Sequence, residues 1–247
     1  MSYQVLDNGM LGLAEPTVSV ARPKRMSRKA MLWTVLACVA AAAALAQVAY
    51  TYSGSGKWEF MEREKGVTVY SMKTPGENAR KFFAVFRIKS TLNQAVAFMQ
   101  DDDSDVSDVG FYDSKTLKQE SSLVRWTTWK MRLPVPMTDR EFVVRHSFSQ
   151  DPVTKTVLYT LDSANELLPE DKCCVRVKRM ANRWSLVPVG NGEVEVRWVM
   201  DVDFGGWIPY FAIDRHLSWE MVDFGSSLQE VVDRKKYIGA DTGWVKE

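Results

Sequence analysis

Residues 193–204 show the clearest pattern in the chain, an alternation of apolar and polar positions. Most residues at the alternate positions are charged. Because successive side chains of a strand point to opposite faces, this run predicts a strand with one wet and one dry face, which is typical of antiparallel sheets. The apolar positions are Val194, Val196, Trp198, Met200 and Val202.

Similar strand-like runs fill most of the chain from residue 58 onward. A hairpin is predicted at Lys65–Gly66, and turns at Pro134–Pro136 and Ala181–Asn182. Residues 92–99 break the period of two and predict a short helix. The predicted strands are residues 59–64, 67–73, 81–89, 121–133, 139–150, 153–162, 173–180, 183–189 and 193–204.

Residues 205–236 carry the second strong pattern, a helical one. After Gly205–Gly206 and a Trp-Ile-Pro bend, apolar residues recur at spacings of three and four. Charged residues, Asp214 among them, mark the predicted wet side. One long amphipathic helix has the length to cover the dry face of a sheet, so the order of elements predicts an α+β fold. The apolar stripe comprises Ile213, Leu217, Met221, Phe224, Leu228 and Val231 or Val232.

The N-terminal part is an export segment. Basic residues between Arg22 and Lys29 precede an apolar run over residues 30–46, and small residues at Ala44 and Ala46 suit signal-peptide cleavage near Ala46. Met26 is an alternative start. An uncleaved single-pass inner-membrane anchor is the competing reading, since a span needs about 20 apolar residues. Both readings place the domain outside the cytoplasm, in the periplasm, because basic flanks stay inside.

These patterns divide the chain into five parts. They are a basic N-terminal region (1–29), a signal or anchor segment (30–50), a flexible linker (51–57), the working domain (58–236) and a C-terminal tail (237–247). The net charge of +1 gives no reason to expect nucleic acid as a partner. We expect a monomer without a cofactor. The 9 Trp and 12 Met fill a core or line an apolar cavity, and composition does not separate the two.

Few residues suit metal chemistry. Asp101, Asp103 and Asp105 match the first positions of a calcium loop, but Val106 and Tyr112 stand where that loop needs Gly and Glu, so a solvated loop is expected. The two histidines have no ligand partners at suitable spacing, and no metal site is predicted. Outside the export segment, the adjacent Cys173 and Cys174 are expected as free, apolar residues of a strand.

Two polar residues fall in phase with apolar faces. Arg125 alternates with apolar residues of the 121–133 run, which points it inward unless an upstream β-bulge turns it to solvent. His146 is in phase with Phe142, Val144 and Phe148. A lone histidine on an apolar face is more often a satisfied structural group than a catalytic base.

The order of these elements resembles a known family, the START lipid-transfer domains with their helix-grip fold. The resemblance extends from Trp58 to about Val232, and it depends on the order of motifs that are each weak alone. The motifs are Gly66-Val-Thr-Val-Tyr70, Pro134-Val-Pro-Met-Thr-Asp-Arg-Glu-Phe142, Val175-Arg176, Arg183-Trp-Ser-Leu-Val-Pro188 and Gly205-Gly-Trp-Ile-Pro209.

The resemblance implies a curved antiparallel sheet around the C-terminal helix, with a tunnel that binds one sterol or phospholipid and transfers it through transient membrane contact. Arg125 would be the cationic member of an ionisable pair. A lid would be formed by Gly205, Gly206, Trp207 and Ile208. The cavity lining would comprise Arg125, Trp129, Met131, Phe142, Trp198, Met200, Phe211, Met221, Phe224 and Leu228.

Two other functions stay open from the sequence. Helix-grip relatives include aromatase and cyclase enzymes, which would need a positioned acid or base such as His146. No catalytic residue is assigned, because Ser185 and Ser218 have no visible base partner. A ligand-sensing module is the third possibility.

Overall fold

The computed structural model describes residues 27–101 and 110–247. The chain divides into two compact units, Met1–Ala41 and Ala42–Glu247. Of the first unit, the described part belongs to helix α1 (Arg28–Thr51), which continues into the second unit. α1 has a mean hydropathy of 2.0 over an 18-residue stretch, so it is long and apolar enough to span a membrane, a property that signal sequences share.

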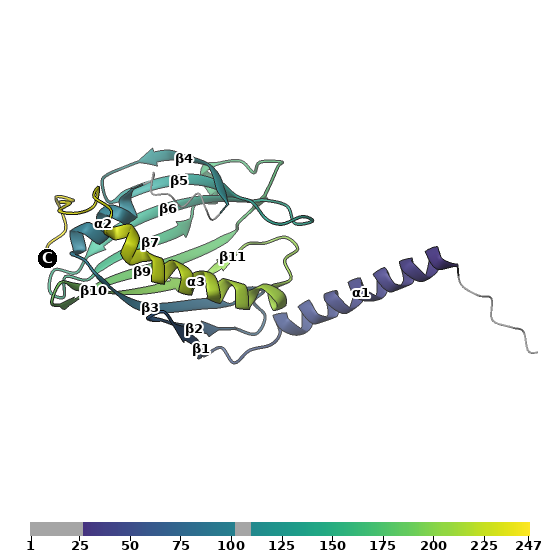
Figure 1. Ribbon diagram of the computed structural model, residues 1–247. Helices are drawn as coiled ribbons and strands as arrows, with labels where there is room; N and C mark the ends of the chain where they lie inside the picture. Colours follow the sequence, from purple (N-terminus) through teal and green to yellow (C-terminus); the bar gives the residue numbers. More distant parts are fainter. Residues whose placement is uncertain (1–26, 102–109) are drawn as a thin grey trace, which may run out of the picture. The chain divides into compact units, whose positions relative to one another are not determined.

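The second unit is built on one antiparallel sheet with a C-terminal helix across it (Figure 1). Short β8 (Val175–Arg176) pairs parallel with β6, and β11 (Val202–Asp203) pairs with β9. A 3-10 turn, η2 (Asn165–Leu167), follows β7. The main order is β1 (Trp58–Glu64), β2 (Val67–Met72), β3 (Lys81–Lys89), β10 (Glu193–Met200), β9 (Arg179–Gly190), β7 (Val157–Ser163), β6 (Arg140–Gln150), β5 (Val124–Met131) and β4 (Phe111–Gln119).

Helix α3 (Tyr210–Val232) covers the inner face of the sheet, and it packs on β2, β3 and helix α2 (Leu92–Gln100). Gly225 allows the close approach, because a Cβ there would lie 2.9 Å from a methyl group of Val67 and 3.1 Å from the Phe86 ring. This architecture confirms the predicted helix-grip α+β fold.

The buried face of α3 differs from the predicted stripe. Met221 and Leu228 are buried as expected, but so are Asp214 and Ser218. The prediction that Asp214 marks the wet side is wrong, since its carboxylate accepts hydrogen bonds from Arg80 and Tyr50. Three predicted stripe members at one edge of this face, Ile213, Leu217 and Phe224, are only partly buried.

Most predicted strands are confirmed, with three corrections. β9 runs unbroken through Ala181–Asn182, where a turn was expected. β4 was not predicted, because its residues are largely polar on both faces. Cys173 and Cys174 lie in a turn and are joined in a disulfide, so the prediction of free strand cysteines is wrong. Most of the possible calcium loop, residues 102–109, lies outside the described residues.

Both segments that flank the predicted domain pack against it. Gly54 lies so close to Lys73 that a Cβ would come within 2.2 Å of its carbonyl oxygen, and Gly56 N donates to the same oxygen at 3.0 Å. In the tail, Val245 is buried in the core. The Glu247 side chain accepts from the Leu92 and Asn93 amides at 2.9 Å. The compact unit is therefore larger than residues 58–236.

Candidate functional site

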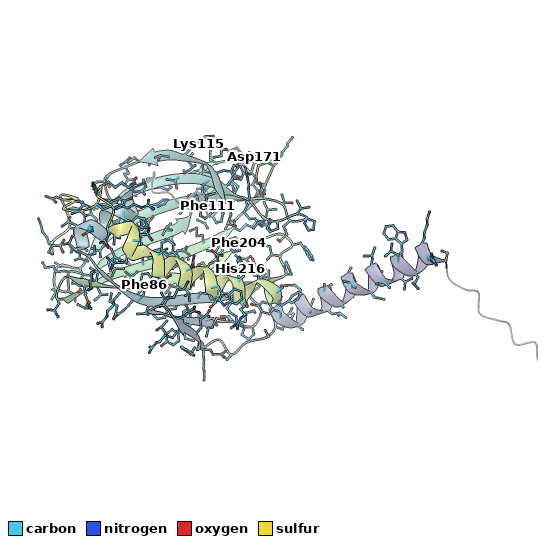
Figure 2. The ribbon with its side chains drawn as sticks, in the orientation of Figure 1. Phe86, Phe111, Lys115, Asp171, Phe204 and His216 are labelled. Carbon is cyan, nitrogen blue, oxygen red and sulfur yellow. A yellow bond between two sulfur atoms is a disulfide. The ribbon has the colours of Figure 1, made fainter. Side chains whose placement is uncertain are left out.

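An aromatic cluster lies on the inner face of β4, β5 and β6. Phe142 stacks on Trp129 with 5.2 Å between ring centroids. Phe111 and Phe204, both labelled in Figure 2, each contact the Phe142 ring edge-on, at 6.5 and 6.3 Å. Phe204 comes from the segment between β11 and α3, so this cluster joins the far strands of the sheet to the chain that leads into the helix.

A second aromatic cluster connects the middle of the sheet to α3. Trp184 of β9 stacks on Trp198 of β10 at 4.3 Å, and Phe224 of α3 contacts both rings at 5.6 and 5.3 Å. The second cluster thus lies at the centre of the sheet and the first lies toward its β4 edge. Each cluster includes one residue from the chain that follows β11, Phe204 or Phe224.

Several apolar side chains on this inner face are only partly buried, although they pack against the core. In an ordinary core such side chains would be fully enclosed, at the packing density of an organic crystal. Their remaining exposure is apolar surface that the fold itself does not cover. They are Trp129, Met131, Trp198, Met200, Phe204, Leu217 and Phe224.

A buried polar group interrupts this apolar surface. Arg125 of β5 is 8% exposed, so it points inward as the alternation predicts. It pairs in register with His146 of β6, and its guanidinium donates to the Met99 carbonyl at 3.5 Å. His146 is held on both sides, by the Thr127 hydroxyl at 2.7 Å and the Tyr159 hydroxyl at 2.6 Å.

Burial lowers the pKa of His146 to about 3, and the nearby Arg125 charge acts in the same direction. The imidazole is therefore neutral at physiological pH. Thr127 and Tyr159 were missed in the sequence, although their positions on adjacent strands face the same side as His146. This confirms that His146 is a satisfied interior group.

A different ionisable pair is buried elsewhere. Arg176 donates to the Glu141 carboxylate at 2.7 Å, with 2% and 7% of the two side chains exposed. Glu141 alternates with Phe142 on β6, so the pair lies on the opposite side of the sheet from the aromatic clusters. It fixes short β8 to β6.

The predicted lid residues occupy the bend before α3. Gly205 and Gly206 both adopt positive φ, 65° and 63°, a conformation that suits glycine. Arg140 holds this bend, because its guanidinium donates to the carbonyls of Phe204 at 2.9 Å, Gly205 at 2.8 Å and Thr138.

The remaining predicted site residues divide between surface and core. Trp207 is 64% exposed and Phe211 is 42% exposed, so both present aromatic surface at the start of α3. Ile208 is buried against Ala79 and Tyr210 and offers no membrane contact, which corrects that part of the prediction. Met221 and Leu228 are fully buried in the core and do not share the partly exposed surface.

Comparison with known proteins agrees with this architecture. An uncharacterised protein of Pseudomonas aeruginosa is 29% identical over 153 residues, which cover 62% of this chain and 75% of that protein. A STAR-related lipid transfer protein from Xanthomonas axonopodis superposes with a TM-score of 0.62 at 21% identity, over 73% of this chain and all of the other.

Human STARD10 superposes with a TM-score of 0.64 at 12% identity, over 75% of this chain and 76% of the other. At sequence identities this low, the similarity to these solved structures supports the fold alone. The START domain family itself matches residues 39–237, most of the chain. The chain therefore belongs to the START domain family.

Proposed function

We propose that this START domain binds one lipid, a sterol or a phospholipid, between the inner face of its sheet and α3, and carries it outside the cytoplasm. The observation that carries the proposal is the partly exposed apolar surface on an inner face that also holds a buried arginine. Covering several hundred Å² of lipid would stabilise the complex by roughly 25 cal/mol per Å². Lost freedom of motion offsets part of that gain.

Arg125 and the groups around it give this surface a polar end. A cation on an apolar wall orients a phosphate or hydroxyl, because the hydrogen bond of the ligand's polar group is made away from competing water. Aromatic and Met side chains would contact the apolar body of the ligand. This arrangement suits a lipid with one polar end.

Lipid binding accounts for the site better than an aromatase or cyclase activity. A general base works best when its pKa lies near the operating pH. His146 is far from this condition, and both ring nitrogens already have hydroxyl partners. START domains are generally lipid binders without enzymatic activity.

Exit of the ligand requires an opening, and the Gly205–Gly206 bend before α3 is the proposed hinge. Trp207 and Phe211 beside it are exposed aromatic residues that suit a transient contact with the bilayer.

We further infer that α1 remains attached as an anchor. Ala43, Ala46, Gln47 and Tyr50 form one helix face that the domain partly covers, on both sides of the cleavage position after Ala46. Tyr50 donates to Asp214, and Thr51 O accepts from Lys73 Nζ at 2.9 Å. The family match also begins before this position, at residue 39.

Native mass spectrometry of the protein purified from the membranes of an exporting host tests both parts. We expect an intact chain that contains residues 30–46 and one co-purified lipid per protein. A chain that begins at Gln47 would contradict the anchor. A ligand-free chain that converts a polyketide substrate would support the cyclase function instead.

A further inference from the structure

The outer face of the sheet, opposite α3, carries an exposed aromatic patch. We define the outer aromatic patch as Trp58, Phe60, Tyr70, Phe83 and Val199. Trp58 and Phe60 are 42% and 60% exposed. The rings form a continuous surface, with centroids 5.8 Å apart for Trp58–Phe83 and 6.0 Å apart for both Phe60–Tyr70 and Tyr70–Phe83.

This patch encloses an open groove of about 300 Å³, lined by Trp58, Tyr70, Phe83 and Val199. The groove is separate from the proposed lipid site, because Phe83 alternates with Phe82, which is fully buried on the inner side. Fold stability does not require exposed aromatic side chains, and contiguous apolar surface of this kind marks an interaction site.

The patch lies at the end of the domain where α1 is attached. Trp58 pairs with Met72, and the next residue, Lys73, donates to Thr51 O at 2.9 Å. Trp58 therefore lies less than about 20 Å from Thr51, the last residue of α1. This distance is the sum of one strand spacing, one residue step and one lysine side chain.

No long spacer separates the apolar helix from the domain. The apolar run over residues 30–46 is about 25 Å long as a helix, the lower limit of a bilayer span. Tyr50 and Thr51 at the end of α1 bond to Asp214 and Lys73, and Gly54 and Gly56 hold the following segment against Lys73. A bilayer that contains this run must end beside the domain.

We propose that the outer aromatic patch is a membrane-docking surface that rests on the lipid interface around α1. The proposal rests on the retention of α1 inferred above. Trp and Tyr favour the membrane interface, where an apolar ring and a polar edge are both accommodated. Lys57, exposed and directly before Trp58, is positioned to contact anionic headgroups.

Photo-crosslinking of the full chain tests the proposal. Phe60 is replaced by the photoreactive analogue p-benzoylphenylalanine, which preserves an aromatic ring, and the protein is reconstituted in nanodiscs of phosphatidylethanolamine and phosphatidylglycerol. The matched control carries the same group at Val189, an apolar residue of β9 that is 38% exposed. Val189 lies six residues along β9 from Arg183, the partner of Val199, or roughly 20 Å away.

We expect lipid adducts at position 60 at least about tenfold above those at position 189. Adducts to a second protein chain would overturn the proposal in favour of a dimer interface. Equal yields at both positions, or no lipid adduct, would also overturn it. The intact mass of the same sample reports whether α1 is present, and the co-purified lipid reports the inner site, so failure of either proposed function is seen separately.

Discussion

Arg125 and His146 face each other on β5 and β6, and the two side chains have different fates at neutral pH. The Arg125 side chain is a cation by its chemistry, whereas burial lowers the pKa of His146 to about 3 and leaves the imidazole neutral. One cation is thus kept where a ligand's polar end would lie.

Replacing Arg125 by Leu should weaken binding of a phospholipid about tenfold or more, because hydrogen bonds to a charged group contribute about 1.5–3 kcal/mol. The measurement is lipid affinity by fluorescence titration. Arg132→Leu, an exposed arginine just beyond the same strand, is the control and should bind normally. Unchanged affinity in the Arg125 variant would remove that residue from the site.

His146 should make the domain sensitive to acid. Its folded pKa of about 3 lies below the unfolded value of about 6.5, so the unfolded chain binds more protons between these values. Stability should therefore fall as pH drops below 6.5, by up to about 1.4 kcal/mol per unit from this group.

Urea unfolding at pH 7 and pH 5 measures this effect. The His146→Gln variant retains hydrogen-bonding capacity without titrating, and it should lose about 2 kcal/mol less than the wild type over that interval. Asp214, whose pKa burial raises, acts in the opposite direction in both proteins and cancels in the difference. Identical pH slopes would contradict the assignment.

At the scale of elements, α3 depends on one small residue for its position. Gly225→Val would force a branched side chain against Val67 and Phe86, and we expect a loss of about 1–3 kcal/mol from overpacking. Thermal unfolding measures it. Ser227→Val, exposed on the same helix, controls for helix propensity and should change stability by less than about 1 kcal/mol.

The bend before α3 makes a separate prediction. Trp207→Ala should slow lipid transfer between vesicles roughly tenfold, since burial of a large apolar side chain contributes about 1.5–3 kcal/mol. Lipid affinity in solution should not change. Trp126→Ala, on the outer face of β5, is the control. Normal transfer by the Trp207 variant would exclude this contact.

The elements that the sequence predicted well are those with complete local patterns. Apolar and polar residues alternate without interruption in β3 and β10, and both strands begin at the predicted residues, Lys81 and Glu193. β4 has no such pattern, and it forms because β5 offers a backbone partner. Asp214 was misassigned because its partner Arg80 lies 134 residues away, beyond any helical period.

For the candidate site, the sequence predicted which side chains face inward but not their hydrogen-bond partners. Alternation placed Arg125, Trp129, Phe142 and Trp198 on the inner face correctly. The hydroxyl partners of His146 depend on strand order, which one sequence does not reveal. The Arg140 clamp, the three hydrogen bonds from this guanidinium to the carbonyls of Thr138, Phe204 and Gly205, was not predicted. An arginine at the start of a strand gives no local sign of such partners.

At the scale of the whole molecule, the end of α1 is part of the domain. Tyr50→Phe removes the hydroxyl that donates to the buried Asp214, and it should cost about 1–2 kcal/mol. Residues 52–57 should then exchange their amide hydrogens faster. Tyr52→Phe, two residues away and 73% exposed, should leave both properties unchanged. Equal exchange in the two variants would contradict the attachment.

The Arg140 clamp has a consequence for the rate of opening. One guanidinium bonds the carbonyls of Thr138, Phe204 and Gly205, so the bend cannot loosen by small steps that each break one weak contact. We therefore expect the proposed opening to be an all-or-none event with a large activation enthalpy, so ligand exchange should accelerate steeply on warming.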